Sequence, residues 1–108
     1  MNTSHIKFSI VALTYLGKVV YIGYTSSDII KYRNTLRTQI ANKSPRISEK
    51  LQNLNVLTNK IEIKLLENSF SESVPARVMA RIASHDTINS GWNTEAEITL
   101  AEVLGHVR

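Results

Sequence analysis

Apolar residues recur along the chain with two different periods, which separate the expected strands from the expected helices. Residues 8–13 and 19–24 are short runs rich in β-branched and aromatic residues, a composition that favours strands. The connection Leu16-Gly17-Lys18 is short, so these strands should be antiparallel neighbours. The chain is therefore expected to begin with a β-hairpin.

Helical spacing of apolar residues begins after the hairpin. Residues 28–42 carry Leu36 and Ile40 on one face, which predicts a helix packed on the sheet. Ser44 and Pro45 match an N-cap followed by proline at the first helical position, so a second helix is expected to start there. Its buried stripe would consist of Ile47, Leu51 and Leu54.

A third strand is expected in residues 60–66, where apolar residues alternate with charged ones. Such alternation predicts one buried face and one face in water. Residues 74–85 then have the spacing of a third helix, with Val78, Met79 and Ile82 turned inward. The order up to this point is strand, strand, helix, helix, strand, helix.

A last helix is expected over residues 94–105. Thr94 and Glu97 have the spacing of a capping box, and Ile98 and Ala101 supply an apolar face. No repeat, linker or low-complexity tract interrupts the sequence. We therefore treat residues 1–108 as one α/β domain.

The composition limits the classes of protein that this chain can represent. Its 108 residues suffice for one hydrophobic core, and the absence of cysteine excludes disulfides and zinc–thiolate sites. No segment has the length and flanks of a signal peptide or a membrane span. A cytoplasmic protein without membrane contact is expected.

Positive charge is concentrated in the first part of the chain. Residues 1–60 carry nine Lys and Arg against two acids, whereas residues 61–108 carry four against seven. Clustered cations along one helix and the following loop are typical of polyanion binding. The cluster consists of Lys31, Arg33, Arg37, Lys43, Arg46 and Lys50.

The segment from Lys18 to Ser26, just before the basic cluster, contains a candidate catalytic residue. An apolar strand ends in Tyr21-Ile22-Gly23, and a turn then leads into the helix that carries Arg33. A phenol can accept or relay a proton, and a guanidinium matches two phosphate oxygens. The combination points to phosphodiester chemistry or to a remnant of it.

This order of motifs resembles the GIY-YIG endonuclease family, and among its members the small phage-type enzymes. The match covers about residues 6–93 and is most specific over residues 8–40. It implies a small three-stranded antiparallel sheet flanked by helices, with residues 94–105 as an extra C-terminal helix. It also implies Tyr21 as a catalytic phenol and Arg33 as the phosphate-stabilising arginine.

The sequence departs from the family pattern in its first half. Val11 stands where the family has its other tyrosine, and no Gly-Ile-Tyr occurs. A gapless comparison puts Lys31 at the catalytic arginine, whereas a turn two residues longer puts Arg33 there. Arg37 replaces the histidine that many members have one helical turn later; it can hold a phosphate but is no base at neutral pH.

The third helix shows the largest departure. The family has a metal-binding glutamate there, but residues 74–85 contain no carboxylate and instead place three basic side chains on one face: Arg77, Arg81 and His85. Cations at this position would repel a divalent ion and hold a phosphate. Glu67 or Glu72, just before the helix, is the alternative metal ligand.

Three functions follow as expectations. The first is a nucleic-acid-binding protein, with DNA rather than RNA as partner, in which hydrolysis is lost or weakened. The second is an active endonuclease that uses Mg²⁺ or Mn²⁺. The third is a protein-interaction module or inhibitor that reuses the scaffold, motivated by the contrast between a basic front half and an acidic last helix.

Overall fold

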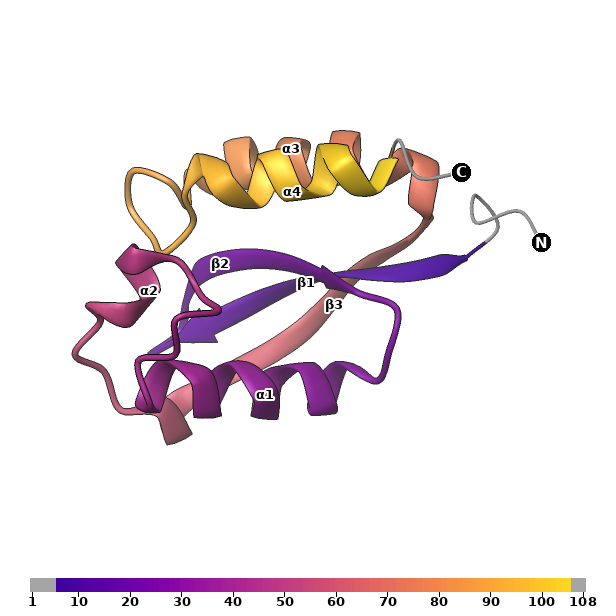
Figure 1. Ribbon diagram of the computed structural model, residues 1–108. Coiled ribbons are helices and arrows are strands. Elements are labelled where there is room, and N and C mark those ends of the chain that lie inside the picture. Colours follow the sequence, from indigo (N-terminus) through magenta and orange to yellow (C-terminus); the bar gives the residue numbers. More distant parts are fainter. Residues whose placement is uncertain (1–5, 106–108) are drawn as a thin grey trace.

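The computed structural model describes residues 6–105 and contains one antiparallel sheet with the strand order β2-β1-β3. The strands are β1 (Lys7–Tyr15), β2 (Lys18–Thr25) and β3 (Ile61–Phe70). Helices lie on both faces of this sheet (Figure 1). The expected three-stranded antiparallel sheet flanked by helices is therefore confirmed.

The turn between β1 and β2 has two residues in the left-handed region. Leu16 has φ 51° and Gly17 has φ 82°. Two consecutive positive φ values match the twist of the flanking strands, which is why such tight turns connect hairpins. The hairpin expected from the sequence is present, and each strand extends slightly beyond its predicted limits.

One face of the sheet is covered by α1 (Ile29–Ala41) and α2 (Glu49–Gln52). Asp28 caps α1, because its carboxylate accepts hydrogen bonds from the backbone N–H of Ile30 (2.7 Å) and of Lys31 (3.1 Å). The buried core beneath these helices consists of Leu13, Val20, Tyr21, Leu36, Ile40, Leu51, Ile61 and Trp92. Trp92, from the loop before α4, is therefore part of this core.

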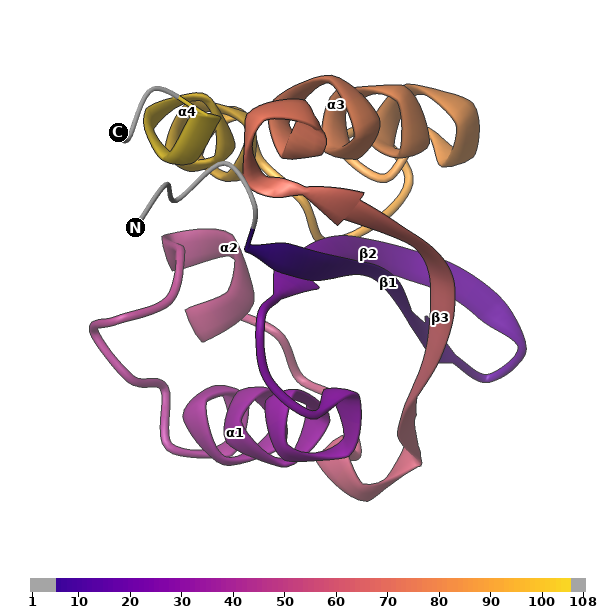
Figure 2. The ribbon, with the colours of Figure 1, turned by 90° about the vertical axis from the view of Figure 1, so that its right-hand side faces the viewer.

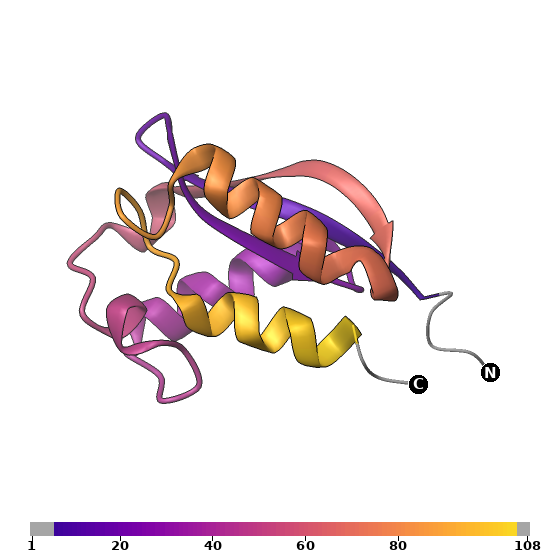
Figure 3. The same cartoon turned by 90° about the horizontal axis from the view of Figure 1, so that it is seen from above.

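The opposite face is covered by α3 (Val74–His85) and α4 (Glu95–Gly105), which lie side by side (Figures 2 and 3). Short 3-10 turns, Thr58–Lys60 and Ser71–Ser73, precede β3 and α3. The second core consists of Phe8, Ile10, Ala12, Ile22, Val74, Val78, Ile82 and Ala101. Among the described residues, no helix is both long enough and apolar enough to cross a membrane.

The second helix is much shorter than expected, and its predicted start is wrong. α2 begins at Glu49, and Ser48 caps it by accepting the Leu51 N–H at 3.3 Å. Ser44 instead accepts the N–H of Arg46 at 3.1 Å in the preceding loop. Serine side chains form such local turns as readily as they cap helices, which explains the error.

A bulge in β3 changes the face on which its side chains lie. Ile10 pairs with Glu67 while the next residue of β1, Val11, pairs with Leu65, so Leu66 is an extra residue. Leu66 packs against the core under α3, and Leu65, expected inside, is 48% exposed. The simple alternation of buried and exposed residues expected for this strand is therefore wrong from Leu65 onward.

Met79 was also predicted to be buried, but 43% of its surface is exposed. Val78 and Ile82 are buried as expected, so the inward stripe of α3 is narrower than predicted.

Candidate functional site

The edge of β2 is closed by side chains and a loop rather than by another strand. The Trp92 N–H donates to the Val20 carbonyl at 2.6 Å. The Asn93 amide pairs with Ile22 as a strand would, because Oδ1 accepts its N–H (2.7 Å) and Nδ2 donates to its carbonyl (3.0 Å). The loop approaches so closely that a Cβ on Gly91 would lie 2.4 Å from the Val20 oxygen.

A half-open pocket of about 240 Å³ lies beyond this closed edge. β2 forms its floor, and α1 and α4 flank it from opposite faces of the sheet (Figure 1). The wall from α1 is Tyr32, and the wall from α4 is formed by Glu97 and Leu100. The complete lining is Tyr21, Ile22, Gly23, Tyr24, Tyr32, Glu97 and Leu100.

Two phenols meet in this pocket, that of the buried Tyr21 and that of the partly buried Tyr32. The hydroxyls of Tyr21 and Tyr32 hydrogen-bond with each other. Burial, together with nearby Tyr32 and Glu97, raises the pKa of Tyr21 well above its ordinary value, and burial also raises the pKa of Tyr32. Both phenols are therefore neutral at physiological pH, which makes Tyr21 a proton donor or relay rather than a ready base.

Gly23 makes room for this pair. A Cβ at Gly23 would lie only 2.1 Å from the Tyr32 hydroxyl oxygen and 3.3 Å from Cε2 of Tyr21. The lack of a side chain at Gly23 in the Tyr-Ile-Gly motif therefore allows Tyr32 of α1 to pack closely against β2.

Glu97 is held firmly by three donors. Its Oε1 accepts from the Thr94 N–H (2.6 Å) and from the Asn93 side-chain amide (3.0 Å), and its Oε2 accepts from the Thr94 hydroxyl (3.1 Å). The Thr94 hydroxyl in turn accepts the Ala96 N–H at 3.2 Å. The predicted capping box exists, and it fixes a carboxylate beside Tyr21 and Tyr32.

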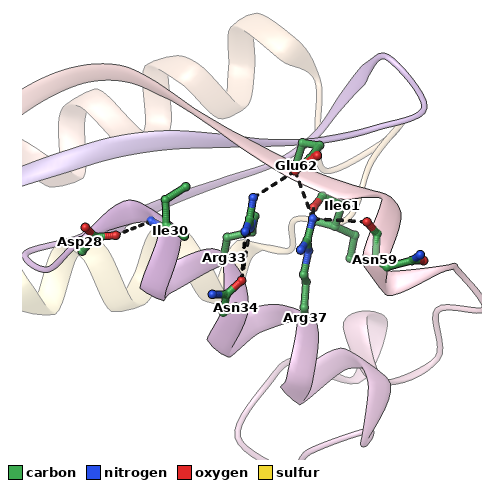
Figure 4. A network of polar contacts seen from close by, with 8 residues as sticks. All are labelled: Asp28, Ile30, Arg33, Asn34, Arg37, Asn59, Ile61 and Glu62. Atoms are coloured by element: carbon green, nitrogen blue, oxygen red, sulfur yellow. Dashed lines mark hydrogen bonds and ion pairs between the residues drawn. The ribbon is translucent and has the colours of Figure 1, made fainter.

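Arg33 and Arg37 lie outside this pocket, on the side of α1 that faces β3 (Figure 4). Both guanidinium groups contact Glu62, at 3.2 Å and 3.1 Å. Arg37 also donates to the carbonyl oxygens of Ile61 and Asn59. The structure thus brings the two arginines together but does not place Arg33 next to the Tyr21 hydroxyl.

Glu67 lies between Arg77 and Arg81. Its two oxygens accept from Arg77 at 2.7 and 3.0 Å and from Arg81 at 2.8 Å. The hydrogen bond from Arg77 is the main reason that the pKa of Glu67 lies below its ordinary value. This cluster ties β3 to α3, with the bulge at Leu66 turning Glu67 toward that helix. His85 is half-buried at the end of the same helix.

Several cations of the basic cluster bind backbone carbonyls. Lys43 donates to Gln52 at 3.0 Å, and Lys50 donates to Ile88 (2.6 Å) and to Asn93 (2.9 Å). Lys31 and Arg46, in contrast, are exposed. The outer face of α1 also has a shallow groove lined by Asp28, Ile30, Lys31, Asn34, Thr35, Thr38 and Gln39.

The two sides of the sheet differ in charge. Residues 28–64, which include α1 and α2, carry eight Lys and Arg against three acids. Residues 67–105, which include α3 and α4, carry two against six. We call residues 28–64 the basic segment. The helices of the two segments lie on opposite faces of the sheet (Figure 2).

The residues expected to hold a divalent metal do not fit one as they stand. Both oxygens of Glu67 already accept hydrogen bonds from guanidinium groups, and Glu72 is exposed in the 3-10 turn before α3. Within residues 6–105, no three His, Asp or Glu side chains gather into a cluster suited to a metal ion.

Sequence reasoning did not identify Tyr32 or Glu97 as members of the site. The capping-box spacing indicated the position of Glu97, but nothing local indicated that α4 returns to the edge of β2. Comparisons with protein-family models, curated proteins and solved structures found no match to this chain. The GIY-YIG resemblance stays a prediction from the quoted residues.

Proposed function

We propose that this protein binds nucleic acid through its basic segment, on a scaffold resembling GIY-YIG endonucleases, with hydrolysis lost or weakened. The observation that carries the proposal is the separation of charge, with an excess of five cations in residues 28–64 and an excess of four acids in residues 67–105. A polyanion would be attracted to one side of the molecule and repelled from the other.

The geometry of α1 supports a role in holding phosphates. Arg33 and Arg37 are one helical turn apart, and Glu62 restrains both side chains while each remains about one-fifth exposed. Restrained guanidiniums lose less conformational freedom when they bind an anion. The neighbouring groove adds amide and hydroxyl groups, which commonly contact phosphate oxygens in nucleic-acid complexes.

Weakened hydrolysis is supported by the arrangement of the residues that the resemblance implies. Tyr21 points into a pocket whose lining contains no cation, while Arg33 contacts Glu62 instead. A scissile phosphate at Tyr21 would therefore lie next to the Glu97 carboxylate without an arginine to neutralise it.

Incubation with supercoiled plasmid and labelled single-stranded DNA, with Mg²⁺, Mn²⁺ or EDTA, tests the proposal. We expect a salt-sensitive mobility shift in all three conditions and no strand cleavage. Metal-dependent nicking that is absent from a Tyr21→Phe/Arg33→Ala variant would establish the active endonuclease instead. Absence of both binding and cleavage would favour the protein-interaction module.

A further inference from the structure

We infer that the pocket beside Tyr21 holds a nucleobase that carries an exocyclic amino group, splayed out of a single strand whose phosphates contact α1. The inference rests on the proposed nucleic-acid function and specifies what the pocket recognises. Its chemistry differs from that of a phosphodiester-cleaving site, in which the same tyrosine would face a phosphate.

The charge of the lining selects the class of ligand. Glu97 is the one charged side chain among the seven lining residues. Its carboxylate repels phosphate groups and accepts hydrogen bonds, so the pocket favours a ligand that donates N–H groups. The neutral phenols of Tyr21 and Tyr32 add hydroxyl groups that a base edge can contact.

The number of open acceptor positions favours an amino group over a full cation. A carboxylate offers about four acceptor positions. Three are taken by the Thr94 N–H, the Asn93 amide and the Thr94 hydroxyl, which leaves one on Oε2 within the described residues. An ammonium ion needs several acceptors to offset its desolvation, whereas one amino N–H of a base needs one.

Size and position fit a single base. The cavity of about 240 Å³ is smaller than the roughly 300–1,000 Å³ of pockets for drug-sized ligands, so it suits one planar ring system. Its walls are mainly aromatic and aliphatic, as in proteins that bind unstacked bases. Tyr32 belongs to α1, the helix that also carries Lys31 and Arg33, so one helix contributes both to the pocket wall and to the proposed phosphate contacts.

Titration with free nucleosides tests the pocket without any contribution from phosphates. We would follow the backbone amide signals of Ile22, Gly23 and Tyr24 by NMR. Cytidine and adenosine are expected to bind about fivefold more tightly than uridine and thymidine, the ratio expected for one additional hydrogen bond.

The Glu97→Gln variant sharpens the test. Glutamine keeps an oxygen for Thr94 and Asn93 but places an N–H₂ donor in the pocket, so the preference should shift toward uridine, whose O4 accepts. Glu102→Gln is the matched control, because Glu102 is exposed on the same helix, outside the pocket lining. We expect the control to keep the preference of the unmodified protein.

Three results would overturn the inference: equal binding of the four nucleosides by the unmodified protein, a preference unchanged in Glu97→Gln, or tighter binding of butylammonium than of cytidine. The comparison of the four nucleosides and the comparison of butylammonium with cytidine need only the unmodified protein. They therefore decide the inference even if the Glu97→Gln variant does not fold. Salt-sensitive binding of oligonucleotides without nucleoside discrimination would leave the proposed function standing and remove the base pocket. Discrimination among the nucleosides without any oligonucleotide binding would instead keep the base pocket and remove the proposed nucleic-acid function.

Discussion

The site residue whose role the structure explains most directly is Gly23. In the sequence it completes the Tyr-Ile-Gly motif, and in the fold it leaves room for the Tyr32 hydroxyl. A side chain here conflicts with a helix residue rather than with the backbone of the strand itself. The conflict can therefore be tested by changing either residue.

Gly23→Ala is expected to destabilise the protein by about 1–3 kcal/mol, because the new methyl group overpacks the site against Tyr32. Urea unfolding measures the loss. The double variant Gly23→Ala/Tyr32→Phe removes the oxygen at 2.1 Å and should be more stable than the sum of the two single changes predicts. Simple additivity would show that the two residues do not meet.

Alkaline titration of tyrosine absorbance tests the phenols of the pocket. The folded-state pKa values of Tyr21 and Tyr32 lie above the ordinary value of 10.0. Their neutral forms therefore favour the folded state, and stability should fall as the pH rises above 10, because unfolding releases protons. We expect these two tyrosines to ionise only together with unfolding. Fully reversible ionisation of all four tyrosines in the folded protein would contradict this.

At the level of elements, the edge of β2 depends on Asn93. This side chain is fully buried and satisfies both backbone groups of Ile22 while also contacting Thr87 and Glu97. Unpaired sheet edges invite association with other chains, and here a loop covers the edge. The loop also fixes the start of α4 and hence the position of the pocket wall.

Asn93→Ala should destabilise the fold by about 2–4 kcal/mol, since it leaves several buried polar groups without partners. Hydrogen exchange of the Ile22 amide should accelerate at the same time. Asn89→Ala is the matched control, because Asn89 is exposed in the same loop and contacts Asp86. Equal effects of the two changes would argue against the edge-closing role.

The ion-pair cluster between β3 and α3 should make stability depend on acid pH. The pKa of Glu67 is lowered in the folded state, first by its hydrogen bond with Arg77. Its contribution is therefore present above the ordinary value of 4.5 and disappears as the pH falls through the folded pKa.

Glu67→Gln should be less stable than the unmodified protein at neutral pH, and the difference should shrink below pH 4.5. Thermal unfolding across this range measures it. Because Arg77 is exposed, added salt should also reduce the difference. If the difference in stability between Glu67→Gln and the unmodified protein did not change with pH, the charge of the Glu67 carboxylate would not contribute to stability.

Periodicity predicted the hairpin, the first, third and last helices and the capping box, because each depends on local sequence. The predicted start of the second helix at Ser44 was wrong, because this serine forms a local turn instead of a helix cap. The predicted alternation in β3 was wrong near Leu66, because the bulge there depends on pairing with β1. Periodicity also missed the meeting of Tyr32, Glu97 and Asn93. That contact depends on how residues far apart in the sequence return to the edge of β2.

At the scale of the whole molecule, the helices of the basic segment lie on one face of the sheet, and the helices of the acidic residues 67–105 lie on the other. Many of the cations have structural partners: Arg33 and Arg37 contact Glu62, and Lys43 and Lys50 bind carbonyl groups. The charge of these residues still contributes to the potential around α1, because Glu62 offsets only one of the two arginines. Lys31 and Arg46 remain exposed for direct contact.

The central claim is tested most directly by the salt dependence of binding to a labelled single-stranded oligonucleotide. We predict that log K falls linearly with log salt, and that Lys31→Gln/Arg33→Gln reduces the slope by about 1.4, or about 0.7 for each lost phosphate contact. Lys7→Gln, an exposed cation at the start of β1, should leave the slope unchanged. A slope near zero, or equal slopes for the unmodified protein and the double variant, would contradict nucleic-acid binding through the basic segment.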